Sequence, residues 1–344
     1  MQFSQTLLNW YEENKRSLPW RGELDPYKIW VSEIILQQTR VNQGWEYYLR
    51  FIETFPDVKS LADASEEQVL KVWQGLGYYS RARNMHVAAQ SIIRNHHAIF
   101  PKDYHDIISL KGIGDYTAAA VSSIAFNLPY PAVDGNVFRV ICRIFGFFDD
   151  IALPATRKKV TETCLSLMDR HQSGIFNQAM MDFGALHCTP QNPQCGSCPF
   201  QLNCYAFNHE AVDRLPVKIK KGKIKERYFH YFVWIQQGST IIEKRTGNDI
   251  WKNLYQFPLM ETETSKEKEI QQYFMENKID IAIEPVCQIK HQLTHQTIFA
   301  YFYKFETDCL PLLKKDQIVV SLDKIEQYPF PKIISIFLEN LLEK

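Results

Sequence analysis

Two acidic residues in this 344-residue chain stand where a carboxyl group could do acid–base chemistry. Glu33 lies in the run YKIWVSEIILQQT, and on a helix it would share a face with Ile29 and Trp30. A carboxyl group on a largely apolar face tends toward a raised pKa, which a general acid needs, although a helical Glu is more often merely exposed. Asp134, in AVDGNVFRV, could cap a helix or stand as a second rigid carboxylate beside Asn136. Such a pair can cleave a glycosidic bond: one acid protonates the leaving group, and the other stabilises the oxocarbenium-like sugar or orders water.

Four of the eight cysteines, namely Cys188, Cys195, Cys198 and Cys204, fall in one short stretch with the spacing C-x6-C-x2-C-x5-C. Such clustering favours a metal site over disulfides in a chain without an extracellular signature. Four thiolates suit zinc or an iron–sulfur cluster, and structural zinc sites more often pair two short C-x2-C knuckles. The single knuckle with flanking cysteines therefore favours a [4Fe–4S] cluster modestly over zinc.

A third motif, LKGIGDYTAAA, contains Gly112 and Gly114 two residues apart. The glycines permit a tight turn between helices, with backbone N–H groups at a helix N-terminus that suit one phosphate. An ordinary helical corner would have the same composition. With Leu before it and an Ala-rich helix after it, the motif is a moderate signal for a helix–hairpin–helix that binds the DNA backbone.

These residues must be positioned by two kinds of domain. Residues 1–210 predict a nearly all-helical region, with periodic segments at 26–38, 65–74, 80–95, 116–126, 135–145 and 156–170. Residues 214–227 (RLPVKIKKGKIKER) predict a basic linker, either a solvated tether or one that contacts phosphates. Residues 228–344 predict an α+β domain, with strands at 228–236, 240–245, 286–290 and 297–305 and helices at 266–278 and 332–342.

Composition limits the remaining possibilities. The formal net charge is zero, so any basic footprint for nucleic acid must be local. No apolar run of about 18 residues predicts a membrane helix, and no signal peptide is evident, which points to the cytoplasm.

Together these motifs resemble the endonuclease III superfamily of helix–hairpin–helix DNA glycosylases, and within it the MutY family of adenine DNA glycosylases. The resemblance spans roughly residues 1–215 and is carried by LPWR, DPYKIWVSEIILQQTRV, GLGYYSRARN, LKGIGDYTAAAV, AVDGNVFRV and FNQAMMDFGALHCTP followed by the cysteine loop. It implies a mainly α, two-lobed fold, with a six-helix barrel over residues 20–126. Residues 1–19 and 127–213 would form a lobe holding one [4Fe–4S] cluster per chain.

The resemblance also implies roles for individual residues. Glu33 would protonate adenine N7, Asp134 would stabilise the deoxyribosyl cation, and Asn136 and Tyr116 would support that charge. The adenine pocket would be lined by Trp20, Arg21 and Gln178. The opposing oxidised guanine would be contacted by Gln38, Thr39 and Tyr78. The implied partner is duplex DNA with an A:8-oxoguanine or A:G mispair, bound by a monomer away from any membrane.

The second domain resembles the C-terminal domain of the same family, a relative of Nudix hydrolases, through EKRTGNDIWKNLYQFP. It lacks an R-E-x-x-E-E metal-binding helix, so we expect no pyrophosphohydrolase activity. In the family a Phe-Ser-His loop recognises 8-oxoguanine, and the matching residues here are Leu293, Thr294 and His295. Thr294 keeps the hydroxyl, whereas Leu293 replaces an aromatic residue.

Two other functions fit part of the pattern. A bifunctional glycosylase/lyase of the endonuclease III type needs a lysine amine to form a Schiff base, and the matching position holds Tyr116. A non-catalytic iron–sulfur DNA-binding module would not require Glu33 and Asp134 together.

Overall fold

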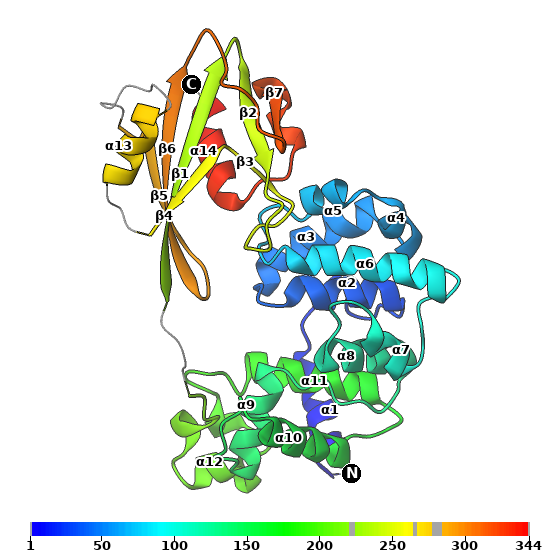
Figure 1. Cartoon of the computed structure of the whole chain (residues 1–344). Helices are drawn as coiled ribbons and strands as arrows, with labels where there is room; N and C mark the ends of the chain where they lie inside the picture. Colours follow the sequence, from blue (N-terminus) through cyan, green and yellow to red (C-terminus); the bar gives the residue numbers. More distant parts are fainter. Residues whose placement is uncertain (1, 220–223, 264–266, 277–283, 343–344) are drawn as a thin grey trace. The chain divides into compact units, whose positions relative to one another are not determined.

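The computed structural model describes residues 2–219, 224–263, 267–276 and 284–342. These residues form two compact units (Figure 1). The first comprises Met1–Ala64 and Asn84–Lys220, and the second comprises Ser65–Arg83 and Lys221–Lys344. Residues 65–83 therefore group with the C-terminal part of the chain, although the sequence places them inside the helical region.

The first unit is helical, as the sequence predicts. Its elements are α1 (Gln2–Asn14), α2 (Pro26–Leu36), α3 (Val41–Thr54), α4 (Val58–Asp63), most of α6 (Ser80–Asn95), α7 (Tyr104–Ser109), α8 (Asp115–Phe126), α9 (Gly135–Phe145), α10 (Pro154–Leu167), α11 (Ser173–Leu186), η1 (Cys195–Ser197), η2 (Gln201–Asn203), α12 (Tyr205–Asn208) and η3 (Val212–Arg214). None of the described helices is both long and apolar enough to cross a bilayer.

The N-terminal helix packs on helices that come more than a hundred residues later. Leu7, Leu8 and Tyr11 of α1 join one buried cluster with side chains of α9, α10 and α11. The same cluster extends to three of the four clustered cysteines. The cysteine loop is thus seated on the core of this unit and is not an appendage.

The described residues of the second unit form a seven-stranded sheet with the order β3-β2-β1-β6-β5, in which β4 also pairs with β1 and β7 with β2. Its elements are α5 (Glu66–Val72), β1 (Lys225–Gln236), β2 (Ser239–Lys244), β3 (Tyr255–Gln256), β4 (Leu259–Thr262), α13 (Glu267–Glu276), β5 (Cys287–Gln292), β6 (Gln296–Glu306), β7 (Gln317–Ser321), η4 (Leu322–Gln327) and α14 (Lys332–Leu342). The central pair, β1 and β6, is parallel, and the other pairs are antiparallel.

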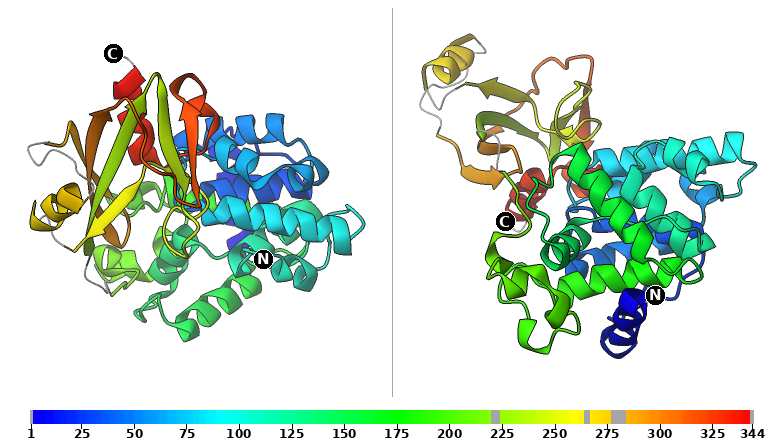
Figure 2. Two further views of the ribbon diagram at one scale, coloured as in Figure 1. Left: turned by 45° about the horizontal axis from the view of Figure 1, so that its top comes forward. Right: turned by 90° about the horizontal axis from the view of Figure 1, so that it is seen from below.

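Both faces of the sheet are apolar, because residues of either parity along β1 carry large apolar side chains. Phe229 and Tyr231 of β1 pack with Phe337 of α14, whereas Phe232 packs with Phe274 of α13. Because successive strand residues point to opposite faces, the two helices cover opposite sides of the sheet (Figure 2). The four strands and two helices that the sequence predicts in this domain are all found among the described residues, although residues 266, 277 and 278 of the predicted helix 266–278 lie outside them. The elements β3, β4, β7 and η4 were not predicted.

The predicted hairpin between β1 and β2 turns through Gln237 and Gly238, which both have positive φ, at 45° and 72°. Two such residues are typical of a type I′ turn. The predicted linker 214–227 is described only in part, because residues 220–223 lie outside the described residues. Arg214 ends η3 and Lys225 begins β1, so both ends of the basic segment belong to regular elements.

The turn between α7 and α8 depends on one of its two glycines. Gly112 has φ +81°, and a Cβ atom there would lie 2.6 Å from Cβ of Asn84. Gly114 is the N-cap of α8 with extended backbone, and a Cβ there would meet no atom within 4 Å. Steric need therefore explains Gly112 alone, and Gly114 keeps the helix N-terminus open to an approaching group.

We predict that Gly112→Ala lowers the melting temperature by several degrees, because a left-handed residue with a Cβ costs roughly 1–2 kcal/mol even before the clash with Asn84. The matched variant Gly114→Ala should melt within about two degrees of the wild type. Thermal unfolding followed by circular dichroism measures both. Equal melting temperatures for the two variants would contradict this account of the turn.

Candidate active site

A hollow of about 280 Å³ in the first unit brings the four predicted catalytic residues together. Glu33 of α2, Tyr116 of α8, and Asp134 and Asn136 at the start of α9 all line it. The two carboxylates that the sequence could only list separately therefore face one space. Its volume is near the lower end of the range for small-ligand pockets, which is roughly 300–1,000 Å³.

Glu33 is held by a helix whose other residues are almost all apolar. Asp25 caps α2 by accepting a hydrogen bond from the Tyr27 backbone N–H at 2.9 Å, and Pro26 begins the helix. The Glu33 side chain is only 8% exposed, and burial raises its pKa. The Tyr116 hydroxyl and the charge of Arg21 offset part of that rise. Glu33 is thus a buried carboxyl group that holds its proton to a higher pH than a surface glutamate.

Tyr116 lies in the first turn of α8 and points its hydroxyl at the acid. Its O–H donates to Glu33 Oε2 at 2.7 Å, and its oxygen lies 3.1 Å from Met181 Sδ. Burial and the neighbouring carboxylates raise the pKa of Tyr116 well above its usual range. The phenol therefore stays protonated and can donate a hydrogen bond across the whole physiological pH range.

Asp134 acts as the N-cap of α9, as one interpretation of the sequence predicts. Its Oδ1 accepts from the backbone N–H groups of Asn136 at 2.9 Å and Val137 at 2.8 Å, while Oδ2 accepts from Asn136 Nδ2 at 2.7 Å. Withdrawal from solvent raises the pKa of Asp134, and these three donors oppose the rise. Asp134 is therefore both a helix cap and a rigid carboxylate, because the capping hydrogen bonds fix the carboxyl group that faces the hollow.

Asn136 is in turn fixed by a buried arginine that the sequence did not single out. Arg139 Nη2 donates to Asn136 Oδ1 at 2.8 Å and to the Gly184 carbonyl at 2.7 Å, and Arg139 Nε donates to the Cys188 carbonyl at 2.7 Å. A Cβ on Gly184 would lie 2.6 Å from Cβ of Asn136, so only glycine allows α11 to approach here. One guanidinium thus joins the carboxylate site to the first residue of the cysteine loop.

A buried aspartate that is paired with two arginines orders the rim of the hollow. Asp182 is fully buried and accepts from Arg16 Nη2 at 2.5 Å and Arg21 Nη2 at 2.7 Å. Trp20 and Arg21 line the hollow, as expected for an adenine pocket. Gln178 is not among the lining residues, and its Oε1 accepts from the Tyr11 hydroxyl at 3.1 Å.

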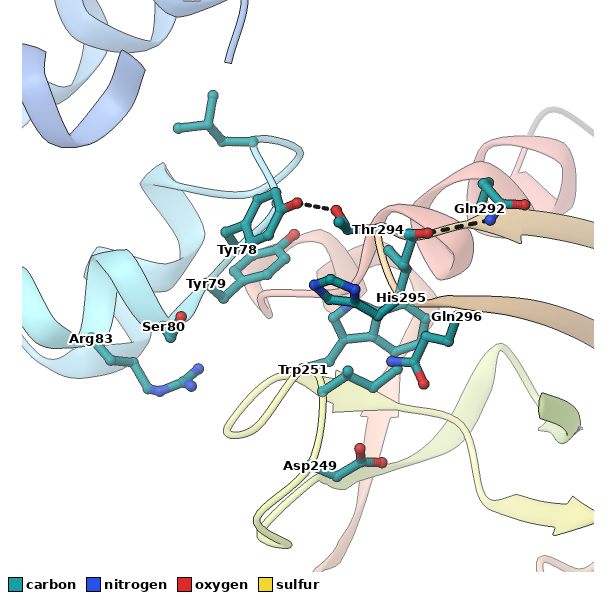
Figure 3. Close-up of a pocket in the computed structure, with 14 residues that line it drawn as sticks. Tyr78, Tyr79, Ser80, Arg83, Asp249, Trp251, Gln292, Thr294, His295 and Gln296 are labelled. Carbon is teal, nitrogen blue, oxygen red and sulfur yellow. Dashed lines mark hydrogen bonds between the residues drawn. The ribbon is translucent and has the colours of Figure 1, made fainter. Parts of the chain in front are cut away.

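The residues predicted to meet the opposing base divide between the two units. Thr39 lines the hollow, and Gln38 is exposed in a left-handed conformation with φ +59°, so α2 ends at Leu36 and not at 38 as predicted. Tyr78 lies in the second unit, where its hydroxyl is hydrogen-bonded to Thr294 Oγ1 (Figure 3).

Tyr78 and the predicted recognition loop share a second hollow, of about 460 Å³, within that unit. Leu293, Thr294 and His295 all line it, together with Trp251. Tyr78 and residues 293–295, which are predicted to meet the oxidised guanine, therefore line one hollow, although they come from distant parts of the sequence (Figure 3).

The four clustered cysteines lie close to one another in the first unit. The charges of Cys188 and Cys204 raise the pKa values of Cys195 and Cys198, in addition to the larger effect of burial. Arg143, which is 3% exposed, donates from Nη1 to Cys188 Sγ at 3.5 Å and to the Thr189 carbonyl at 2.7 Å. Among the described residues, no group of three or more His, Cys, Asp or Glu side chains is arranged to hold a metal ion.

Sequence reasoning missed Arg139, Arg143 and Asp182, which hold these sites together. A single sequence offers little signal for them, because an arginine or aspartate in a helix is usually at the surface. For the two arginines the only cue is their position, because Arg139 and Arg143 lie one turn apart on α9, soon after the capping residue Asp134.

Comparisons with known proteins match two family models to different parts of the chain. Residues 31–169 match a model of the "HhH-GPD superfamily base excision DNA repair protein", and residues 230–340 match a NUDIX domain. An adenine DNA glycosylase of Buchnera aphidicola subsp. Schizaphis graminum is 35% identical over 98% of each chain. The human adenine DNA glycosylase is 39% identical over 62% of this chain and 41% of its own length.

Two solved structures share the fold of the helical region. A thermostable thymine-DNA glycosylase superposes with a TM-score of 0.56 at 28% identity, covering 60% of this chain and 95% of its own. A trapped endonuclease III–DNA covalent intermediate gives a TM-score of 0.53 at 23% identity, with 61% and 95% coverage. At that identity the second likeness concerns the fold alone.

The burial of Glu33 predicts a pH-dependent effect on stability. Because its pKa is raised above the ordinary value of 4.5, the folded protein holds a proton that the unfolded chain releases, so stability falls as pH rises from about 4.5 through the raised pKa. Each pKa unit of that rise lowers the free energy of unfolding at high pH by about 1.4 kcal/mol. Glu33→Gln should therefore be more stable than the wild type at pH 7, with the difference shrinking toward pH 4.5.

Urea unfolding at a series of pH values measures this effect, with Glu53→Gln, an exposed residue of α3, as the control. For the control, the difference in stability from the wild type should not shrink in this way toward pH 4.5. A Glu33→Gln variant less stable than the wild type at pH 7 would show that the carboxylate is stabilising and the assigned pKa direction is wrong.

Proposed function

This chain belongs to the adenine DNA glycosylase family of base excision repair, and from that premise we propose that it removes adenine paired with 8-oxoguanine or guanine in duplex DNA. One observation carries the proposal: the buried Glu33 carboxyl, capped by the Tyr116 hydroxyl at 2.7 Å, faces the same hollow as Asp134. The base lies inside the duplex stack, so adenine must leave it to reach that hollow.

The chemistry proposed for the hollow follows from the two carboxylates. Glu33, with its raised pKa, gives its proton to N7 of adenine, so that the base leaves as a neutral molecule. Asp134 is fixed by its three capping bonds, and its negative charge stabilises the deoxyribosyl cation while the N-glycosidic bond breaks. Water then attacks the sugar carbon, and the proton that it loses passes to the Glu33 carboxylate, which restores the acid.

The neighbouring residues would orient the two acids and the base. Tyr116 holds one oxygen of Glu33 and leaves the other free for the base, and Asn136 holds Asp134 Oδ2. Trp20 and Arg21 line the hollow and would contact the adenine ring. We keep Gln178 in this set on resemblance alone, because its side chain is bound to Tyr11.

Contacts with DNA outside the hollow are proposed at three places. Gly112 and Gly114 present the start of α8 to one phosphate. Gln38 and Thr39 would meet the base opposite the adenine. Thr294 and His295, with Tyr78 beside them, would read the altered edge of 8-oxoguanine through hydrogen bonds, and Leu293 would replace the aromatic contact of the family with an aliphatic one.

A monofunctional reaction is favoured over the lyase alternative by the residues of the hollow. Among the described residues that line it there are arginines but no lysine, and Tyr116 occupies the position at which the related lyases carry an amine. A phenol cannot form a Schiff base with the sugar. A non-catalytic DNA-binding module would leave the burial of two facing acids without a purpose.

The cysteine loop supports one [4Fe–4S] cluster, held by Cys188, Cys195, Cys198 and Cys204. The four thiols lie near one another, and their spacing, one short C-x2-C knuckle with a single cysteine on either side, suits ligands spread around a cubane. When bound, the cluster would supply a covalent tie that fixes a loop with little regular structure. Arg143 would balance the negative charge of the thiolates through its contact with Cys188 Sγ.

Glu33→Gln should retain DNA affinity and lose adenine excision by at least about a hundredfold, because the amide keeps the Tyr116 contact but cannot act as a strong acid. The test is single-turnover adenine release from an A:8-oxoguanine duplex, with Glu53→Gln as the control. Near wild-type release by Glu33→Gln would remove the acid assignment, and unchanged release by a Glu33→Gln, Asp134→Asn double variant would favour contamination by another enzyme.

Purified protein should contain about four irons per chain. Cys198→Ser should lose iron and DNA affinity, whereas Cys309→Ser, at an exposed thiol outside the loop, should keep both. Iron and zinc are measured by elemental analysis of an anaerobic preparation. One zinc and no iron would reject the cluster, and normal DNA affinity in soluble, iron-free Cys198→Ser would reject its role in holding the loop.

A further inference from the structure

The hollow in the second unit contains an aromatic residue to which no role has yet been given. Trp251 lies in the loop between β2 and β3 and lines the hollow beside His295, with Tyr78 and Thr294 also on its walls (Figure 3). The indole is half-exposed. It is the largest side chain on the wall of this hollow.

The backbone at Trp251 has an unfavourable conformation. Its φ is +59°, in the left-handed region where a bulky residue is a genuine outlier. Asn253 nearby has φ +65°, but asparagine tolerates this region readily. Such strain persists only where the surrounding structure enforces it, and it clusters at functional sites.

Two arginines enforce the shape of the loop from one side. Asp249 accepts from Arg227 Nη2 at 2.6 Å and from Arg245 Nη2 at 2.9 Å. Arg245 Nε also donates to the Ile250 carbonyl at 3.2 Å. The residues before Trp251 are therefore tied to β1 and β2 by charged hydrogen bonds, which are stronger than neutral ones.

Residues of the 65–83 segment hold the loop on its other side. Asn253 Nδ2 donates to Glu66 Oε1 at 2.5 Å, and Arg83 Nη1 donates to the Lys252 carbonyl at 2.8 Å. The Trp251 carbonyl accepts from the Leu254 N–H at 3.0 Å. The loop is thus clamped on both sides of the one residue whose conformation is strained.

The ring itself is anchored but not covered. It meets Phe229 edge-on, with ring centroids 6.0 Å apart at 81°, and lies 6.1 Å from the His291 ring. A rigid, half-exposed aromatic ring suits a nucleotide, because a base stacked on the ring would be held with its edge toward the hydrogen-bonding groups of Thr294 and His295, which alone distinguish one base from another.

We infer that Trp251 is a further specificity-determining residue, which packs against the oxidised-guanine nucleotide while Thr294 and His295 read its edge. The occupant of the hollow is then the DNA strand opposite the adenine. This inference rests on the proposed function, since it takes from it the assignment of Thr294 and His295 to 8-oxoguanine. It adds a residue whose aromatic surface supplies contact area beside Leu293, where the family's own aromatic residue is missing.

The test compares three full-length variants, Trp251→Ala, Trp251→Phe and Trp251→Gly, with the wild type. Dissociation constants are measured at one salt concentration for duplexes with a non-cleavable adenosine analogue opposite either 8-oxoguanine or guanine, because phosphate contacts vary with salt. Trp251→Ala and Trp251→Gly should lower the preference for 8-oxoguanine roughly tenfold, and Trp251→Phe should keep most of it. Full preference in both the Ala and Gly variants would overturn the inference.

The glycine variant separates a binding role from a structural one. Glycine adopts φ +59° without strain, so Trp251→Gly should melt no lower than Trp251→Ala. Loss of preference in a Gly variant that melts normally is therefore loss of the ring and not of the fold. Leu312→Ala, at a side chain that is 98% exposed, serves as the control and should leave both the preference and the melting temperature unchanged.

A Thr294→Ala variant measured in parallel shows which claim has failed. If Thr294→Ala lowers the preference and the Trp251 variants do not, the inference is wrong and the proposed recognition of 8-oxoguanine stands. If the wild type itself shows no preference between the two duplexes, the proposed function of this unit fails and the inference falls with it.

Discussion

The hydrogen bond from Tyr116 to the buried carboxyl of Glu33 is the interaction around which the helical unit is organised. A carboxyl group that is 8% exposed is tolerated only with a polar partner at hand, and the partner here comes from a different helix. That requirement is met because α8 begins at the turn that Gly112 makes possible, with Tyr116 in the first turn of the helix. The turn places Tyr116 over Glu33, and on the proposed function it would also present the start of α8 to a phosphate.

Rigidity at the second carboxylate comes from a chain of polar contacts that ends in the cysteine loop. Asp134 is bound to Asn136, Asn136 to Arg139, and Arg139 to the carbonyl of Cys188. A neighbouring arginine, Arg143, reaches the sulfur of the same cysteine. Ordering of the loop by a metal cluster would therefore also order the groups that hold Asp134, although the loop contributes no side chain to the hollow.

Much of this arrangement could be predicted from local patterns. The cap at Asp134, the hairpin at 237–238, α6 and α14 follow from residue types at fixed spacing. The parallel pairing of β1 with β6 could not be predicted, because it joins strands some sixty residues apart whose alternation fits either direction. Short elements such as β3 and β7 contain too few residues to show a period.

The functional residues were harder to predict from local patterns than the helices and strands. Motif resemblance named Glu33 and Asp134, but only the fold shows that both face one hollow. Trp251 escaped notice because a tryptophan in a polar loop has no periodic signature, and its left-handed backbone is a tertiary effect. Likewise, nothing in residues 65–83 indicates that Glu66 and Arg83 hold the loop between β2 and β3.

The central claim is that Glu33 delivers a proton from a carboxyl group whose pKa burial has raised. Its most direct test is the pH dependence of single-turnover adenine release by the wild-type protein from an A:8-oxoguanine duplex, over about pH 5 to 9. The account predicts a rate constant that falls as pH rises through an apparent pKa above 4.5, because the acid loses its proton. A rate constant that stays flat or increases across that range would contradict it.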